Sequence, residues 1–256
     1  MTIPPKAKIK HIPAPLTEDL FLAHEINDVN HIFCWAALAD QIDGTTYTNL
    51  TSHFPTMLLE NKQYIFVAYN YTTNAIIVRA IVDREAPTIV AAFDDVFSYL
   101  ERKGFKPRFN VLDNEASLAI TKYLCSQHIK WQFVPLNEHR SNAVEQAIQT
   151  FKNHFISGLC ITDKNFPLQL WNHLAHQAEI TCNLLRKSRI DPTISAYHQL
   201  HGHKYNWNAH PLAPPGTCAL ILNPPALRSS WGPRAIDAWY CGPAMDFVWL
   251  VPDRSC

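Results

Sequence analysis

The order of the apolar runs constrains the fold of this chain more than any other feature of its sequence. Three short β-rich runs follow one another, at 46–51, 64–71 and 75–82. Asn61-Lys62 and Thr73-Asn74 supply turn chemistry between them. Because β-branched and aromatic runs joined by such turns are typical of strands, we expect three sequential antiparallel strands.

A helix and two strands separated by a second helix follow this meander. Pro87 begins an apolar stripe at helical spacing and Gly104 ends it; the stripe comprises Ile89, Val90, Phe93, Val96, Phe97 and Leu100. A strand at 108–112, a helix at 116–127 and a strand at 130–134 come next, and this order predicts parallel pairing in one sheet.

Two long helical patterns complete this part, at 141–159 and 167–186. The second is expected to bury one face, formed by Leu170, Leu174, Ala178, Cys182 and Leu185. The predicted order of elements is therefore βββαβαβαα.

The two ends of the chain differ from this centre. Residues 1–43 predict an extended, Pro-rich segment followed by a helix, and residues 44–205 hold the α/β core. Residues 206–256 are rich in Pro and Trp and predict a small β-rich module packed by aromatic side chains.

Charge and hydropathy exclude several classes of protein. Lys and Arg together number 22, as do Asp and Glu, so the formal net charge is 0, and 17% of residues are charged. Intrinsic disorder and a strongly basic nucleic-acid tail are therefore excluded. Without a long apolar run or a secretory signal, and with seven scattered cysteines, we expect no membrane span and an intracellular protein, nuclear or cytoplasmic.

The predicted fold class is α/β, with a mixed five-stranded sheet flanked by helices in the ribonuclease H-like arrangement. In that arrangement, acidic residues on the first strand, at the end of the fourth strand and on a later helix converge on divalent metals. Asp113 ends the predicted fourth strand, and Glu145 lies in the first turn of the following long helix. An Asp at a strand end can equally be a turn residue, and a Glu at a helix start can be a cap, so the pair alone leaves both interpretations open.

The chain resembles the integrase core of copia-type retrotransposon polyproteins, especially an algal lineage, over about nine tenths of its length. The segments that carry the resemblance are HIFCWAALAD, GTTYTNLTSHFP, KQYIFVAYNY, TNAIIVRAIVDRE, VLDNEAS, NEHRSNAVEQAIQTFKNHFISGL, FPLQLWNHLAHQAEITCNLLRKSRIDPTISAYHQLHG, PLAPPGT, SWGP and DAWYCGPAMDF, in that order. The resemblance implies a Mg²⁺- or Mn²⁺-dependent polynucleotidyl transferase that joins element DNA ends to target DNA. It also allows a homo-oligomer.

Carried over residue by residue, the resemblance makes Asp113 the second and Glu145 the third acidic metal ligand. The first belongs in a Thr-Asp-Leu-Thr segment, where this chain has Asn49. An amide offers one neutral oxygen and neither the charge nor the bidentate geometry of a carboxylate. We therefore expect a degenerate copy with an integrase core fold and impaired catalysis.

Basic residues near the predicted helices are candidates for phosphate contacts. His139, Arg140 and Lys152 lie around the helix that carries Glu145, and Arg186, Lys187 and Arg189 follow the next helix. Such residues can equally be solvated side chains without a ligand, and the zero net charge predicts weak nonspecific DNA binding.

Two alternatives stay open at this point. One keeps the fold but makes the chain a non-catalytic DNA-binding or interaction module, either a relic or a domesticated integrase core. The other is an unrelated α/β protein, in which the strand with Asn49, the end of the strand before Asp113 and the helix with Glu145 do not converge.

Overall fold

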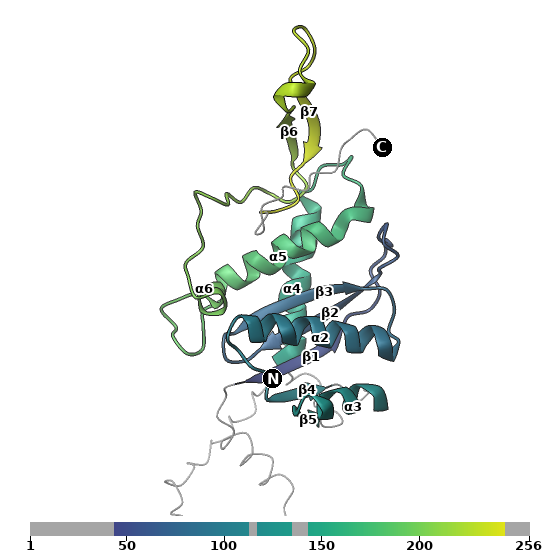
Figure 1. The fold of residues 1–256 in the computed structure, drawn as a ribbon, viewed down its shortest axis with the longest axis vertical. Coiled ribbons are helices and arrows are strands. Elements are labelled where there is room, and N and C mark those ends of the chain that lie inside the picture. Colours follow the sequence, from purple (N-terminus) through teal and green to yellow (C-terminus); the bar gives the residue numbers. More distant parts are fainter. Residues whose placement is uncertain (1–43, 113–116, 135–142, 244–256) are drawn as a thin grey trace, which may run out of the picture. The chain divides into compact units, whose positions relative to one another are not determined.

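The computed structural model describes residues 44–112, 117–134 and 143–243 (Figure 1). The segment and helix expected within 1–43 lie outside these residues, so they stay a prediction. The described residues belong to one compact unit.

A mixed five-stranded sheet forms the centre of this unit. Its strands are β1 (Thr45–Leu50), β2 (Tyr64–Asn70), β3 (Ala75–Ile81), β4 (Phe109–Leu112) and β5 (Lys130–Phe133). They lie in the order β3-β2-β1-β4-β5. The first three strands pair antiparallel, whereas β1 with β4 and β4 with β5 pair parallel. This is the ribonuclease H-like arrangement, and the predicted fold class is confirmed.

One face of the sheet is covered by α2 (Ala86–Arg102), α3 (Leu118–Ser126) and the short α6 (Ala196–His201). The predicted stripe of α2 is buried at Ile89, Phe93, Val96, Phe97 and Leu100, as its helical spacing requires. The sequence did not predict α6, whose first turn is capped by the Ser195 hydroxyl accepting a hydrogen bond from the His198 amide at 3.1 Å.

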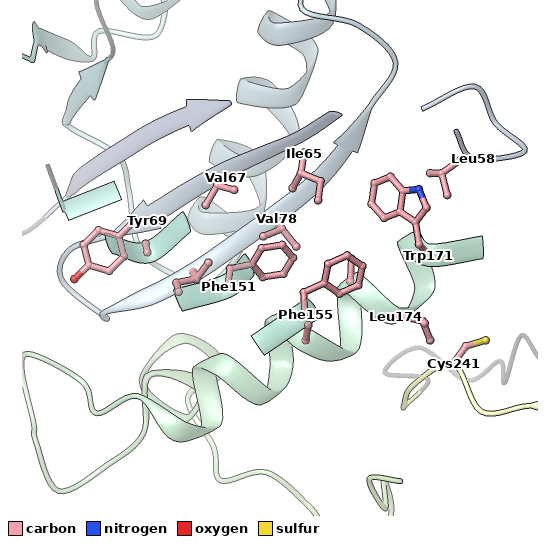
Figure 2. Packing of buried hydrophobic residues seen from close by; sticks show 14 of the residues in the cluster. Leu58, Ile65, Val67, Tyr69, Val78, Phe151, Phe155, Trp171, Leu174 and Cys241 are labelled. Carbon is pink, nitrogen blue, oxygen red and sulfur yellow. The ribbon is translucent and has the colours of Figure 1, made fainter. Parts of the chain in front are cut away.

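The opposite face is covered by α4 (Ala143–Cys160) and α5 (Trp171–Leu185), with a 3₁₀ turn at Leu168–Leu170 before α5. Figure 2 shows Phe151 and Phe155 of α4 against the strand residues Val67 and Val78, with Trp171 beyond them. The predicted face of α5 is buried at Leu174, Ala178 and Cys182. Leu185 contradicts the expectation, because it is 75% exposed, whereas its neighbours Asn183 and Leu184 in the last turn of the helix are buried or packed.

Polar residues of α5 cover the edge of the sheet. The Asn183 amide accepts a hydrogen bond from Ile76 N and donates one to Ile76 O, both at 2.8 Å. The Glu179 carboxylate accepts from Val78 N at 2.9 Å and is also paired with Arg79. Because an unpaired edge strand invites pairing with other chains, these side chains take the place of a sixth strand.

A two-stranded antiparallel sheet, β6 (Cys218–Leu222) and β7 (Ala235–Trp239), follows the core, with a 3₁₀ turn at Pro225–Leu227 between its strands. Trp239 and Cys241 at its base join the hydrophobic cluster under α4 and α5. The small C-terminal β structure expected from the sequence is therefore present. No helix among the described residues is long and apolar enough to cross a membrane.

Candidate functional site

The strand directions bring together the elements that the sequence singled out. β1 and β4 are parallel neighbours, and Thr48 pairs with Leu112, the last residue of β4. The carboxyl ends of parallel strands meet at one edge of the sheet, so Asn49 stands beside the end of β4. Asp113 directly follows Leu112 in the sequence, but it lies outside the described residues, and its placement stays a prediction.

Asn49 belongs to the sheet face that α4 covers. Side chains alternate along a strand, Tyr47 packs with the α4–α5 cluster, and Leu50 packs with the α2 cluster. Asn49 therefore shares the face of Tyr47. It is half-buried, and its Oδ1 accepts a hydrogen bond from Leu50 N at 2.7 Å.

Glu145 lies in the first turn of α4, where the helix dipole favours a carboxylate. Its neighbours Val144 and Ala147 are buried in the cluster against β1 and β2, and Glu145 itself is half-buried. The helix that carries Glu145 thus packs on the face that Asn49 shares. The strand order and directions of the sheet, with α4 packed on β1 and β2, argue against an unrelated α/β fold.

The described donors do not fit a pair of divalent cations. Glu145 offers one carboxylate and Asn49 one neutral amide oxygen, which already accepts a backbone hydrogen bond. Within the residues that the structure describes, no three His, Cys, Asp or Glu side chains group as metal ligands. Two closely spaced dications need several anionic oxygens to offset their repulsion, and this set supplies one.

A buried amide network, missed at the sequence level, fixes β1 against β4 next to Asn49. The Asn110 Oδ1 accepts from the Thr46 hydroxyl at 2.8 Å, and its Nδ2 donates to the Thr48 hydroxyl at 3.0 Å. All three side chains are buried. An Asn inside an otherwise apolar strand is the only signal in the sequence that could have indicated it.

The basic residues predicted to meet DNA have different surroundings. Lys152 is half-buried on α4, whereas His139 and Arg140 lie outside the described residues. The Arg186 guanidinium donates from Nε to Asn74 O at 2.9 Å and from Nη2 to Asn74 Oδ1 at 2.6 Å, so it is largely committed to the β2–β3 turn. Lys187 and Arg189 are exposed.

A groove of about 430 Å³ lies between the second half of α4, α5 and residues 212–215. Its lining is mostly apolar and includes Phe155, Leu174 and Pro214. His154 also lines it, and burial lowers the pKa of its imidazole, which favours the neutral form. Without a carboxylate or a cationic side chain in its lining, the groove has neither the chemistry of a metal site nor that of a phosphate site.

No protein-family model matches the chain, and no curated protein is similar to it in sequence. Solved structures similar to it include the HTLV-2 integrase catalytic core domain in complex with magnesium, with 18% identity, a TM-score of 0.46 and coverage of 62% of this chain and 96% of that one. The catalytic core domain of BIV integrase is 13% identical, with a TM-score of 0.45 and coverage of 61% of this chain and 92% of that one.

A third similar structure is the simian T-cell lymphotropic virus intasome in complex with PP2A regulatory subunit B56 gamma, with 16% identity, a TM-score of 0.49 and coverage of 77% of this chain and 68% of that one. Likenesses of this size do not establish activity, ligands or partners. The class of the fold rests on the strand order and directions of this chain.

Proposed function

We propose that the chain is the integrase-like core of a copia-type retrotransposon, a DNA-binding polynucleotidyl transferase domain whose catalysis is impaired at Asn49. The observation that supports the proposal is the parallel pairing of β1 with β4, together with the packing of α4, which carries Glu145, on β1 and β2. The sequence segments that resemble copia-type integrase cores span these same elements.

Asp113, Glu145 and the degenerate Asn49 are the proposed catalytic positions, and Asp113 and Glu145 are the proposed ligands of Mg²⁺ or Mn²⁺. Bound there, the cation supplies charge that stabilises the displaced and attacking oxygens in phosphoryl transfer. With an amide in place of the first carboxylate, the site lacks one negative charge. Metal occupancy should therefore be low, and so should strand-transfer activity.

A second candidate function is a non-catalytic DNA-binding or interaction module on the same fold. It is favoured by Asn49, whose oxygen accepts the Leu50 amide instead of supplying a charge. DNA is the proposed partner of both candidates, contacted by Lys152, Arg186, Lys187 and Arg189, together with His139 and Arg140. Self-association into a homo-oligomer is proposed only for the first candidate, the polynucleotidyl transferase.

A strand-transfer assay with Mg²⁺ or Mn²⁺ tests the proposal. The native protein should show weak or no activity, and Asn49→Asp should raise it. The matched control is Asn208→Asp, which adds the same charge at an exposed position in the segment after α6.

Comparable activity of the native protein and Asn49→Asp would contradict the proposed impairment. If both are inactive while the native protein binds DNA in a salt-dependent manner, the non-catalytic module replaces the enzyme as the function.

A further inference from the structure

We propose that Arg189, held over the ring of Tyr71, is a preorganised phosphate-binding position for a DNA strand on the sheet face that carries Asn49. The inference rests on the proposed function, because it takes DNA as the ligand. It adds a defined binding geometry and assigns roles to tyrosines that the sequence did not single out.

The guanidinium of Arg189 is fixed on two sides although the residue is exposed. Its Cζ lies 4.0 Å from the centroid of the Tyr71 ring, which is close enough for cation–π attraction and stacking. Its Nε donates a hydrogen bond to the Tyr69 hydroxyl at 3.0 Å. Two independent contacts therefore restrict the plane and the rotation of the guanidinium.

The end of the guanidinium that bears the two Nη groups remains available. Among the described residues, no acceptor bonds to these groups, and Arg189 is in no ion pair with a described carboxylate. The nearest acidic residue in the sequence, Asp191, accepts hydrogen bonds from the amide and the hydroxyl of Thr193. Two parallel N–H groups on a planar cation match the oxygens of a phosphodiester.

The segment that carries Arg189 is anchored to the sheet by Asn74. This residue has a positive φ of 62°, which asparagine adopts more readily than most residues. Its Oδ1 accepts from the Tyr69 hydroxyl at 2.7 Å and from Arg186, and its Nδ2 donates to Lys187 O at 2.6 Å. Tyr69, which accepts the hydrogen bond from Arg189 Nε, is thus itself held by Asn74 in the turn between β2 and β3.

This position lies on the same face of the sheet as Asn49. Tyr47 pairs with Tyr69 across the strands, and its ring centroid lies 6.0 Å from those of Tyr69 and Tyr71. Tyr47 and Asn49 are two residues apart on one strand face, roughly 7 Å. Tyr71 follows Asn70, which pairs with Thr46, so Arg189 lies toward the amino end of β1 and the candidate catalytic positions lie toward its carboxyl end. Thr46 and Asn49 are three residues apart, roughly 10 Å, a separation that a bound DNA strand spans within a few nucleotides.

Exposed arginines and lysines usually lose rotamer freedom when they bind a ligand. Arg189 has lost much of that freedom already, through Tyr71 and Tyr69. We therefore expect the geometry of the guanidinium, as well as its charge, to determine its contribution. Lysine in its place keeps the charge but loses the planar fork and the stacking.

The test measures binding of a fluorescein-labelled DNA duplex with a single-stranded overhang by anisotropy, in EDTA and across salt concentrations. Arg189→Ala should weaken binding several-fold and lower the slope of log K against log salt by about 0.9, one phosphate contact. Arg189→Lys and Tyr71→Ala should weaken it nearly as much, whereas Tyr71→Phe, which keeps the ring, should bind like the native protein.

A control variant, a further test variant and a folding measurement separate this role of Arg189 from a general loss of charge and from unfolding. Lys122→Ala removes an exposed cation from α3, on the opposite side of the sheet, and should change neither affinity nor slope. Asn74→Gly keeps the positive φ but removes the anchoring amide, so it should weaken binding like Tyr71→Ala. Circular dichroism confirms that each variant is folded.

The inference is overturned if Arg189→Ala and Tyr71→Ala bind as Lys122→Ala does, or if Arg189→Lys binds as the native protein does. Because these titrations contain no divalent metal, their failure leaves the proposed metal site to be judged by metal binding without DNA. If the native protein binds no DNA even at low salt, the inference and the DNA-binding part of the proposed function both fail.

Discussion

Replacing Asn110 by alanine should destabilise the sheet at the junction of β1 and β4. Its amide makes two buried hydrogen bonds, to the hydroxyls of Thr46 and Thr48. At about 1 kcal/mol each, with an added cost for the cavity, we expect the free energy of unfolding to fall by roughly 2–4 kcal/mol. Urea unfolding followed by tryptophan fluorescence measures this change.

Asn153→Ala is the matched control, since Asn153 is exposed on α4 and its side-chain oxygen accepts a hydrogen bond from Gln149 at the surface. Its effect should stay within about 0.5 kcal/mol. Asn110→Asp should cost more than Asn110→Ala at neutral pH, because the substitution would bury a carboxylate. The reasoning is refuted if Asn110→Ala unfolds at the same urea concentration as Asn153→Ala.

Three further predictions concern the sheet edge, a turn and pH. Asn183→Ala removes two hydrogen bonds to Ile76 and exposes the β3 edge. It should lower the free energy of unfolding by roughly 1–3 kcal/mol, measured by urea unfolding, and promote aggregation, measured by light scattering. An unchanged free energy of unfolding and unchanged scattering would refute the role of Asn183 at the sheet edge. Gly44→Ala should lower the free energy of unfolding by about 1–3 kcal/mol in urea, because the φ of Gly44 is 84° and the added Cβ would lie 2.7 Å from Lys106 O. An unchanged free energy of unfolding would contradict this prediction. Burial, helped by Lys103, His203 and His176, lowers the pKa of His201 from 6.5 to about 4, so the unfolded chain binds the proton first and stability should fall as pH drops from about 6.5 to 4. His201→Asn should reduce this fall in thermal unfolding, whereas His53→Asn, at an exposed position that does not act on His201, should not.

The apolar patterns of the sequence predicted most helices and strands of the core, because alternation and helical spacing are local properties. The three antiparallel strands, the parallel pair and the buried stripe of α2 were all predicted from runs of a few residues. The prediction that Leu185 is buried was wrong for the same reason. The apolar spacing continues to the end of α5, but spacing alone does not show which of these side chains has a neighbour to pack against.

The buried polar residues could not be predicted from local pattern. Asn183 and Glu179 bond to strand residues about a hundred positions earlier in the chain, and Asn110 bonds to threonines more than sixty positions away. Their partners are defined only by the topology of the sheet. The candidate site shows the same division. Asp113 and Glu145 were predicted from their places in the expected elements and Asn49 from the resemblance, whereas the roles of Tyr69, Tyr71 and Asn74 are defined only by the structure.

The central claim, that Asn49 disables a metal site formed with Asp113 and Glu145, is tested most directly by calorimetric titration with Mg²⁺ and Mn²⁺. The account predicts weak binding by the native protein, tighter binding by Asn49→Asp, no change in Asn208→Asp and loss of binding in Asp113→Asn. Tight binding of two metal ions by the native protein would contradict it.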